Sequence, residues 1–551
     1  MADGSQHGFN FPHHAHSRLR AGEIVVDLFA GGGGASTALE QALGRPVDVA
    51  INHNPWAVAM HAANHPLTSH LCQDVWEADP RIECAGKPVG WLHASPDCTH
   101  FSQAKGGQPR SRATRSLSWV VLRWAGTVRP RIISLENVKE ILKWGPLVAK
   151  RCKVTGRVMK LDGSIAAPGE RVAIDQQFLI PDKRHAGRTW QHFVRALRRL
   201  GYAVEWQRLK ACDFGAGTSR ERLFLCARLD GQPIQWPAPS HGPAAPQPHI
   251  PAAACIDWSI PCPSIFARKK PLADATLRRI ARGVKRYVID AAEPFIVGEV
   301  APVITEHANS SNARSWRADE PLRTQCAGVK GGHFALASAT LVQTGYGERA
   351  GQSPRSLDIG QPLGTIVAGG VKHALASASL VKFRGASDGA AITEPLPTIT
   401  SGAGAARPAG AAHALGLLEA ELQQPISAEH EAGALRVAAF LINYYGNGQA
   451  LDLADPVDTI TTRDRLALVT VRVRGVPYVI VDIGLRMLKP HELYAAQGFP
   501  PGYIIDRTAD GRAVSVSRSV AMVGNSVSPP PLRAIAEANL DAHLRVEALA
   551  A

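Results

Sequence analysis

Four consecutive glycines that follow a short apolar strand constrain the fold of this chain more than any other feature. The stretch "EIVVDLF" (Glu23 to Phe29) is typical of a buried strand, and the glycines from Gly31 to Gly34 follow it. A helical pattern then extends to Leu43. Glycines at this point let the backbone approach a ligand closely at a helix N-terminus. Strands and helices continue to alternate as far as about Ala227, which predicts an α/β layered fold.

The bulk composition is that of a globular protein with a basic excess. The 551 residues suffice for two or three domains, 45% of them are apolar, and the formal net charge is +14. Such an excess indicates a polyanionic partner, with nucleic acid as the first expectation. No apolar run reaches about 18 residues and the N-terminus lacks a signal-peptide core, so we expect a cytoplasmic protein without membrane contact.

Nine cysteines are scattered along the chain without a CxxC pair. Without a signal peptide they indicate reduced thiols rather than a disulfide framework or a zinc site. The N-terminal tail contains His7, His13, His14 and His16, and a solvated segment is expected there rather than a metal site. We therefore predict no bound metal.

The second half of the chain repeats itself after a Pro- and Ala-rich stretch that begins near Gln232. Each copy has a Pro turn, a Thr-centred short strand, a Gly-rich or basic tip and a second apolar stretch. The copies are Glu320–Val342, Gln361–Val381, Glu394–Gly416 and, more weakly, Asp455–Val471. Such copies predict a β-rich repeat domain. It could be a spacer, or it could present basic residues at its loop tips (Lys330, Lys372, Arg407) to a DNA groove.

Three groups of reactive side chains follow or end predicted strands of the first half. Cys98 in "SPDCTHFS" comes shortly after a predicted strand, and Glu136 ends the next one. Arg220 and Arg222 lie on one side of a β-period segment. Active residues of α/β folds lie at such strand ends. Taken singly, each group has an ordinary explanation, as a buried thiol, a capping carboxylate or a surface arginine pair.

Together, and in this order, six motifs resemble the C5-cytosine DNA methyltransferase family of phage or restriction-modification type. "DLFAGGGGAS" is similar to its cofactor loop, "SPDCTHFS" to its nucleophile motif, and "ENV" to its glutamate motif. "SRERLF" resembles its arginine motif, and "LKPHELYAAQGFP" resembles the motif after its recognition domain. "MVGNSVSPP" resembles the last motif, which completes the cofactor pocket. The repeats occupy the place of the family's recognition domain.

The resemblance implies a Rossmann-like, S-adenosylmethionine-dependent methyltransferase domain interrupted by a β-rich target recognition domain. The expected parts are a flexible tail over 1–20, a catalytic domain over 21–231, a linker over 232–265, a recognition region over 266–475 and a C-terminal return over 476–551. The implied activity is that of a DNA (cytosine-5-)-methyltransferase.

The implied reaction explains the types of residue. C5 of cytosine is a poor nucleophile until a thiolate adds to C6, and Cys98 would be that thiolate. Protonated Glu136 would hydrogen-bond N3, with Arg220 and Arg222 near the base O2, a phosphate or Glu136 itself. The burial expected for Glu136 disfavours its charged form. Because C6 is inaccessible inside a duplex, the cytosine must be flipped out.

S-adenosylmethionine is the implied cofactor. Its site is expected to involve Asp27, Phe29, Ala30, Gly31, Gly32, Gly33, Asn52, Trp56, Asp74, Val75, Pro96, Asn525, Ser526 and Val527. Trp56 would stack on adenine or pack in the core. The chain departs from the family pattern where Asp97 replaces a proline and where Asn52 or His53 replaces the ribose-binding acid. It also has Thr218 where glutamine is frequent.

A basic segment follows Cys98. From Cys98 to Leu135 there are seven Lys or Arg residues and no acidic residue. We expect it to clamp phosphates while the base is held out of the duplex, and to offset the Asp97 carboxylate beside the thiol. The predicted DNA-binding residues, here and at the repeat tips, are Ser102, Lys105, Arg110, Arg112, Lys330 and Lys372.

Two rival functions remain from the sequence. One is an RNA cytosine-5 methyltransferase with the same catalytic residues, and the other is a catalytically inactive DNA-binding regulator or protection protein. The large repeat region favours duplex DNA as the partner, and the complete catalytic set favours an enzyme, which we expect to be monomeric. The recognised site and the existence of a cognate restriction endonuclease remain open.

Overall fold

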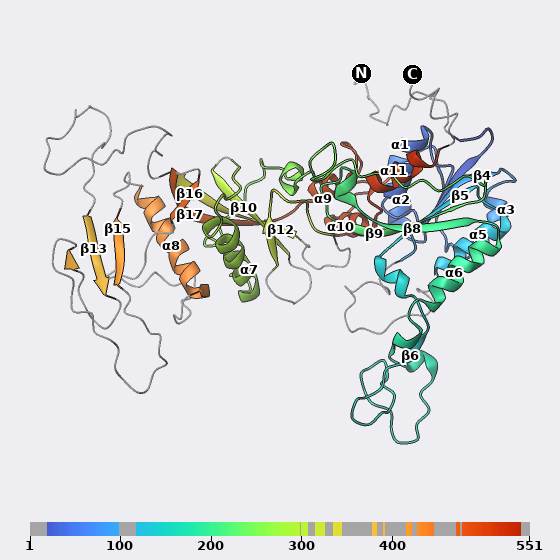
Figure 1. Cartoon of the computed structure of the whole chain (residues 1–551), viewed down its shortest axis with the longest axis horizontal. Coiled ribbons are helices and arrows are strands. Elements are labelled where there is room, and N and C mark those ends of the chain that lie inside the picture. Colours follow the sequence, from blue (N-terminus) through green and yellow to red (C-terminus); the bar gives the residue numbers. More distant parts are fainter. Residues whose placement is uncertain are drawn as a thin grey trace. The chain divides into compact units, whose positions relative to one another are not determined.

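The computed structural model describes most of the first half of the chain and parts of the second half. The described residues are 19–97, 117–297, 299–306, 314–325, 334–343, 377–382, 390–391, 415–420, 427–445, 470–473 and 476–540. The chain divides into two compact units (Figure 1). The first unit comprises Met1–Cys262, Val303–Ala337 and Leu485–Ala551, and the second comprises Pro263–Pro302 and Ser338–Gly484.

A seven-stranded sheet forms the centre of the first unit, in the order β3-β2-β1-β4-β5-β9-β8. Its first five strands are parallel, β9 pairs antiparallel with β5, and β8 pairs antiparallel with β9. The strands are β1 (Ile24–Leu28), β2 (Val49–Ile51), β3 (Ser69–Leu71), β4 (Val89–Ala94), β5 (Ile132–Asn137), β8 (Ala203–Lys210) and β9 (Glu221–Arg228). The direction of the chain along the sheet reverses between β1 and β4, and α/β folds bind ligands at such a point.

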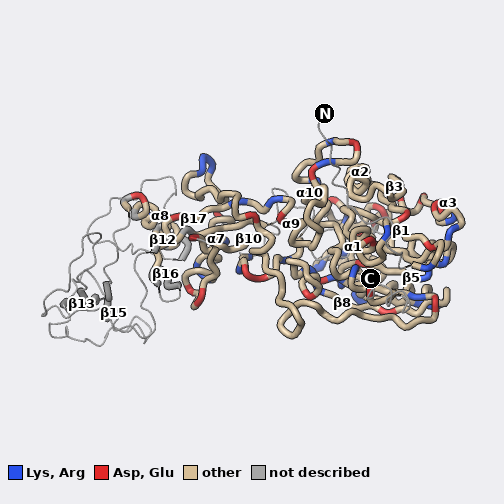
Figure 2. Tube along the Cα trace, turned by 90° about the horizontal axis from the view of Figure 1, so that it is seen from above, with Lys and Arg blue, Asp and Glu red and all other residues tan. Residues whose placement is uncertain are grey.

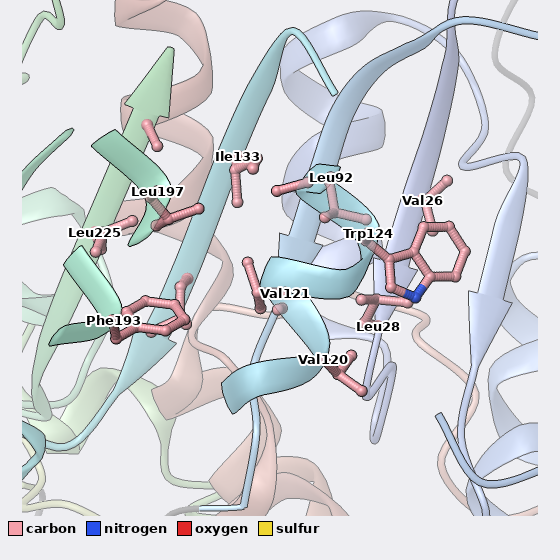
Figure 3. Close-up of a cluster of buried hydrophobic side chains, with 14 of the residues drawn as sticks. Val26, Leu28, Leu92, Val120, Val121, Trp124, Ile133, Phe193, Leu197 and Leu225 are labelled. Carbon is pink, nitrogen blue, oxygen red and sulfur yellow. The ribbon is translucent and has the colours of Figure 1, made fainter. Parts of the chain in front are cut away.

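Helices cover both faces of this sheet because successive strand residues point to opposite sides. Val26 packs with Trp124 and Phe193 in one cluster of buried side chains (Figure 3), and Val25 packs with Leu39 and Leu532 in another. The helices of the first unit are α1 (Gly34–Leu43), α2 (Pro55–Asn64), α3 (Pro80–Glu83), α5 (Val120–Thr127), α6 (Arg188–Arg199), α9 (Pro490–Gln497), α10 (Val516–Asn525) and α11 (Pro529–Ala538).

The predicted α/β fold with a Rossmann-like sheet is confirmed. Helix α1 begins and ends where the pattern predicts, because Gly33 and Gly44 adopt left-handed conformations at its two ends. The helix predicted over Pro531–Leu549 begins two residues earlier as α11 and ends at Ala538. Residues 541–551 lie outside the described part of the chain.

Two further sheets are built from later strands. A five-stranded sheet has the order β11-β10-β12-β17-β16, and a three-stranded antiparallel sheet has the order β14-β13-β15. Their strands are β10 (Val300–Glu306), β11 (Ser315–Arg317), β12 (Phe334–Gln343), β13 (Ser377–Lys382), β14 (Ala390–Ala391), β15 (Leu415–Ala420), β16 (Thr470–Val473) and β17 (Val476–Met487). Helices α7 (Asp274–Val284) and α8 (Ala428–Tyr445) belong to the second unit.

The repeat copies share one feature in the described residues, which is a strand at or near the C-terminal end of each copy. These strands are β12, β13, β15 and β16. In the described part of the first copy, residues 320–325, no Thr-centred strand is formed, and Leu322 makes an isolated bridge to Thr218. The remaining Thr-centred segments and the tips with Lys330, Lys372 and Arg407 lie outside the described residues.

The segment expected as a linker, 232–265, takes an irregular path but packs on the first unit for most of its length. Trp236 lies against the cluster that contains Leu532, and Ile256 is buried. The first unit extends to Cys262, and it also includes 303–337 from the segment expected to belong to the recognition region. No described helix is both long enough and apolar enough to cross a membrane.

Candidate active site

The carboxyl ends of β1, β4 and β5 bring three of the predicted motifs to one edge of the sheet. The glycine turn follows β1, Ser95 to Asp97 follow β4, and Glu136 lies at the end of β5. Because β4 lies between β1 and β5, the segment that leads to Cys98 lies between the other two motifs. Ser95 joins this segment to the end of β1, because its backbone N–H donates to Leu28 O and its hydroxyl donates to Phe29 O.

The glycine turn is shaped by the C-terminal part of the chain. A Cβ on Gly32 would lie 2.9 Å from the Met522 carbonyl oxygen, and one on Gly33 would overlap the Tyr503 hydroxyl. The Gly34 N–H donates to Ser526 Oγ at 3.1 Å, although 492 residues separate the two. The sequence predicts that these glycines let the backbone approach a ligand, and in the structure Gly32 to Gly34 also allow the close approach of the C-terminal part of the chain. Gly31 differs, since its Cβ position lies near only the Phe29 oxygen, at 3.7 Å.

Gly34→Ala is expected to separate the glycine turn from the C-terminal return. Its methyl group would overlap the Val527 carbonyl oxygen and lie 2.5 Å from Ser526 Oγ, and neither neighbour is a flexible side-chain end. Forced contacts of this kind destabilise a protein by about 1–3 kcal/mol. Denaturant unfolding measures this change. Gly126→Ala is the control because its methyl group would meet no atom within 4 Å, and an unchanged midpoint for Gly34→Ala would contradict the packing.

A buried chain of polar groups supports the glycine turn from behind. Ser36 Oγ donates to Asp27 Oδ2 at 2.8 Å and contacts His61 Nε2 at 2.9 Å. Burial raises the pKa of Asp27 to about 7, with the hydrogen bond from Ser36 opposing the rise. Burial also holds the pKa of His61 well below its usual value, so this imidazole is neutral. Asp27, a predicted cofactor ligand, therefore lies inside the sheet and supports helix α1.

A second buried chain joins helix α1 to the C-terminal part of the first unit. Tyr503 donates to Gly32 O at 3.0 Å, and its hydroxyl lies 3.3 Å from His65 Nε2. The other nitrogen of His65 pairs with Glu40 at 2.9 Å. Tyr503, His65 and Glu40 are not among the predicted site residues. The only sequence signal for them is the position of Tyr503 at the end of "LKPHELYAAQGFPPGY".

The predicted cofactor residues beyond the glycine turn follow β2 and β3. Asn52 comes directly after β2, and its Oδ1 accepts the Asn54 N–H at 2.8 Å. Asp74 is exposed, and its Oδ1 accepts the Trp76 N–H, while Val75 is buried. Trp56 is half-buried in α2, and the Arg518 guanidinium lies 4.0 Å from the centre of its ring. Trp56 therefore already has a cationic neighbour at its ring.

The remaining predicted cofactor residues have mixed surroundings. Ala30 and Pro96 are buried, and Phe29 has a positive φ of 67°. In the last motif, Ser526 and Val527 are buried against the glycine turn, whereas Asn525 is exposed. Asn525 is thus the one residue of this predicted trio that presents its side chain to solvent.

Glu136 and the two predicted arginines meet at the end of β5. Glu136 is 6% exposed, and its Oε1 lies 3.1 Å from Arg222 Nε and 3.9 Å from Arg220 Nη2. Neither contact has hydrogen-bond geometry, so Oε1 accepts no hydrogen bond from the described residues. Arg220 is held independently by donating from Nη1 to Gly524 O at 3.0 Å. The group is thus a buried carboxyl oxygen that still needs a donor, flanked by two cations.

The neighbour of Glu136 links the motifs on β4 and β5. Asn137 is fully buried and donates from Nδ2 to the Pro96 carbonyl oxygen at 2.9 Å. It accepts from the Val138 backbone through its other side-chain atom. The residue two positions before Cys98 is therefore tied to the residue after Glu136. Asn137 is not among the predicted site residues, although it belongs to the quoted "ENV" motif.

Several predicted residues lie outside the described part of the chain. They are Cys98, Ser102, Lys105, Arg110, Arg112, Lys330 and Lys372. Asp97, the last described residue before this gap, is exposed.

One group of side chains in the described residues has the composition of a metal site. Cys212, Asp213 and His249 have potential ligand atoms within 4.8 Å of one another. Asp213 Oδ1 already pairs with His249 Nε2 at 3.0 Å and with the Cys212 thiol at 3.6 Å. Burial raises the pKa of the Cys212 thiol to about 11, and Asp213 adds to the rise. These contacts account for the group as a hydrogen-bonded cluster without an ion.

Comparison with known proteins locates similarity in the part of the chain that carries these motifs. Residues 24–146 and 179–257 match the family model of C-5 cytosine-specific DNA methylases. The Type II methyltransferase M.AgeI of Thalassovita gelatinovora is 26% identical over 223 residues, which are 39% of this chain and 42% of that protein. M.AquIA of Picosynechococcus sp. is 25% identical over 225 residues, which are 40% of this chain and 77% of that protein.

The matched region thus spans less than half the length of M.AgeI. Among solved structures, the S. pombe Dnmt2 methyltransferase is 13% identical with a TM-score of 0.42, over 93% of this chain and 96% of that one. A similarity of this size carries no argument about function. The family match includes the glycine turn, Glu136 and both arginines. The similarity of this chain to C-5 cytosine-specific DNA methylases is therefore carried by residues 24–146 and 179–257.

Proposed function

We propose that this chain is a DNA (cytosine-5-)-methyltransferase that acts on a cytosine flipped out of duplex DNA. The observation that carries this proposal is the surroundings of Glu136. Its buried Oε1 accepts no hydrogen bond from the part of the chain that the structure describes, and it lies 3.1 Å from Arg222 Nε, beside the strand that leads toward Cys98. A flipped cytosine would engage this carboxyl group through the proton that Glu136 shares with N3, and the guanidinium groups would hold its O2 or a phosphate.

The proposed roles follow from the electron flow in the pyrimidine ring. The Cys98 thiolate adds to C6, and the electron pair of the C5–C6 double bond moves to C5. Glu136 shares a proton with N3, so the ring does not accumulate negative charge. C5 then accepts the methyl group, a base removes the C5 proton, and the sulfur–C6 bond breaks to release Cys98. Asn137 holds the loop that leads to Cys98 through Pro96 and acts as a positioning residue.

S-adenosylmethionine, when bound, would supply the methyl group in electrophilic form. The residues at the ends of β1 to β3 have suitable chemistry for it. No described side chain lies within 4 Å of a Cβ placed on Gly31, Asn52 has an amide for the ribose, and Asp74 has an exposed carboxylate for the adenine amino group. The remaining proposed contacts are those at Phe29, Ala30, Val75, Pro96 and Asn525. Ser526 and Val527 would support the cofactor site indirectly, by holding the glycine turn in place. Asp27 would do so through its hydrogen bond with Ser36.

The substrate proposal extends to the second half of the chain. The repeats over 320–471 would read a specific duplex sequence from loop tips that include Lys330 and Lys372, and the loop after Cys98 would clamp the backbone. The Type II names of the relatives support a restriction-modification role, with or without a companion endonuclease. We infer a monomer that works in the bacterial cytoplasm, encoded by the host or by a phage.

Transfer of radiolabelled methyl groups tests the proposal. The full chain is incubated with labelled S-adenosylmethionine and a duplex DNA pool of varied sequence, or with a matched RNA pool. We expect label in the DNA and none in the RNA, and bisulfite sequencing of host DNA should place 5-methylcytosine at one sequence. Label in RNA alone would identify the RNA enzyme instead. Tight DNA binding without any transfer would leave only a binding protein.

A further inference from the structure

A small arm, residues 147–181, stands between the two segments that match the family. The matched ranges end at 146 and resume at 179, so nearly all of the arm lies outside the family's common sequence. It begins shortly after Glu136 and returns to helix α6 at Arg188. In Figure 1 the arm, labelled β6, extends away from the sheet of the first unit. It is therefore a segment outside the family match that follows the strand whose end carries Glu136.

The arm is folded but has almost no core of its own. Strands β6 (Leu147–Ala149) and β7 (Leu179–Pro181) pair at its stem, and isolated bridges such as Arg151↔Val158 and Met159↔Ile165 continue toward its end. Of its side chains only Ala166 and Leu179 are buried. Its exposed large apolar residues are Val154, Leu161, Ile165 and Ile174, and Val154 is 92% exposed. An ordered segment that exposes so much apolar surface fits a contact with another molecule.

The stem of the arm is fixed to the first unit. Trp144 is 3% exposed and packs against Phe193 of helix α6, with ring centres 6.1 Å apart. The backbone N–H of Trp190 donates to the Trp144 carbonyl oxygen, and the backbone N–H of Asp182 donates to the Pro146 carbonyl oxygen across the stem. The base of the arm is thus held against the first unit by a buried tryptophan.

The arm carries an excess of positive charge. Residues 147–178 contain six basic residues (Lys150, Arg151, Lys153, Arg157, Lys160, Arg171) and three acidic ones (Asp162, Glu170, Asp175). Two of the acids are engaged inside the arm, Glu170 with Lys160 at 2.6 Å and Asp162 with Ser164. Lys153 and Arg157, on either side of the Val154 turn, form no ion pair with the described residues. Figure 2 shows Lys and Arg gathered on other parts of the described chain as well, and residues 183–199 contain six of them without any Asp or Glu.

We propose that this arm binds the backbone of duplex DNA on one flank of the target cytosine. Lys153 and Arg157 pair with phosphates there, and the Val154 turn lies against the sugar edge of the groove. The proposal rests on the function proposed above, because that function supplies the duplex. The unpaired cations favour a polyanion over a protein partner, since an apolar protein contact would leave both charges without a partner.

Duplex binding by a charge-neutralised variant tests this proposal. Lys153→Gln/Arg157→Gln is compared with wild type by fluorescence anisotropy on a long duplex over a series of salt concentrations. The logarithm of the DNA association constant falls linearly with the logarithm of the salt concentration, and each phosphate contact makes this slope steeper by about 0.9. Loss of two contacts should therefore make the slope shallower by about 1.8 and weaken binding roughly tenfold at low salt. On a short duplex without flanks, the two proteins should bind alike.

The control pair is Arg81→Gln/Lys87→Gln. Both residues are exposed, the pair again consists of one Lys and one Arg, and they precede β4, at the edge of the sheet opposite the glycine turn. This variant should retain the wild-type slope. An unchanged slope in Lys153→Gln/Arg157→Gln, or an equal decrease in the control, would overturn the proposal.

A second variant removes the arm while keeping its stem. Because Ala149 pairs with Leu179, an Asn-Gly turn can replace residues 150–178 and close a two-residue hairpin. We expect the same melting temperature as wild type and the reduced slope of the double variant. Methyl transfer by wild type on these duplexes reports the proposed function separately. A changed slope with no transfer would reject the enzyme but keep the arm, and transfer with an unchanged slope would reject only the arm.

Discussion

Cys98→Ser is expected to abolish methyl transfer to DNA while leaving DNA binding measurable. A serine hydroxyl in place of the thiol cannot supply a comparable nucleophile for C6 at neutral pH, because the thiolate is the reactive species. The measurement is transfer of label from S-adenosylmethionine to duplex DNA, together with anisotropy on the same duplex. Turnover near the wild-type rate would show that Cys98 is not the nucleophile.

A duplex with 5-fluorocytosine at the target makes the result specific for the covalent step. After methyl transfer the fluorine cannot leave as a proton does, so wild-type protein should remain attached to DNA in a denaturing gel. Cys98→Ser should give no such band. Cys72→Ser is the matched control, because Cys72 is another free thiol and is exposed, and it should form the complex like wild type.

Glu136→Gln is expected to lower kcat for methyl transfer by about 10²–10⁴-fold, the usual contribution of a positioned general acid. The amide fills the space of the carboxyl group but cannot share a proton with N3 in the same way. It also removes the negative charge that lies 3.1 Å from Arg222. Single-turnover rates at saturating DNA and S-adenosylmethionine measure this change without a contribution from binding.

The control for this prediction removes a carboxylate that has no contact with the site. Glu537 forms an exposed i,i+4 pair with Arg533 on helix α11, and such surface pairs contribute little to stability. Glu537→Gln should keep the wild-type rate. The role proposed for Glu136 would be refuted if Glu136→Gln trapped and methylated DNA as fast as wild type, with an equal melting temperature.

Most of the first unit was predictable because its signals are local. Strand β1, the glycine turn and helix α1 occur where period and glycine content predict them, since burial of alternating residues and left-handed caps are encoded within a few positions. Arg220 and Arg222 could likewise be assigned to one side of a strand segment. The repeats were recognisable as copies, yet the described part of the first Thr-centred segment forms no strand, and Leu322 makes an isolated bridge to Thr218 in the first unit instead.

The sequence by itself determined the order of the motifs, the kinds of reactive group and the α/β fold, because these depend on local pattern and on residue chemistry. Only the tertiary structure showed why Gly32 to Gly34 are glycines. Their neighbours Tyr503, Met522 and Val527 come from the other end of the chain, and no local pattern encodes a contact over that separation. The same holds for the link from Asn137 to Pro96 and for the buried oxygen of Glu136, which accepts no hydrogen bond from the described residues. Packing between distant segments decides which polar atoms remain unsatisfied, and those atoms are the ones available for a substrate.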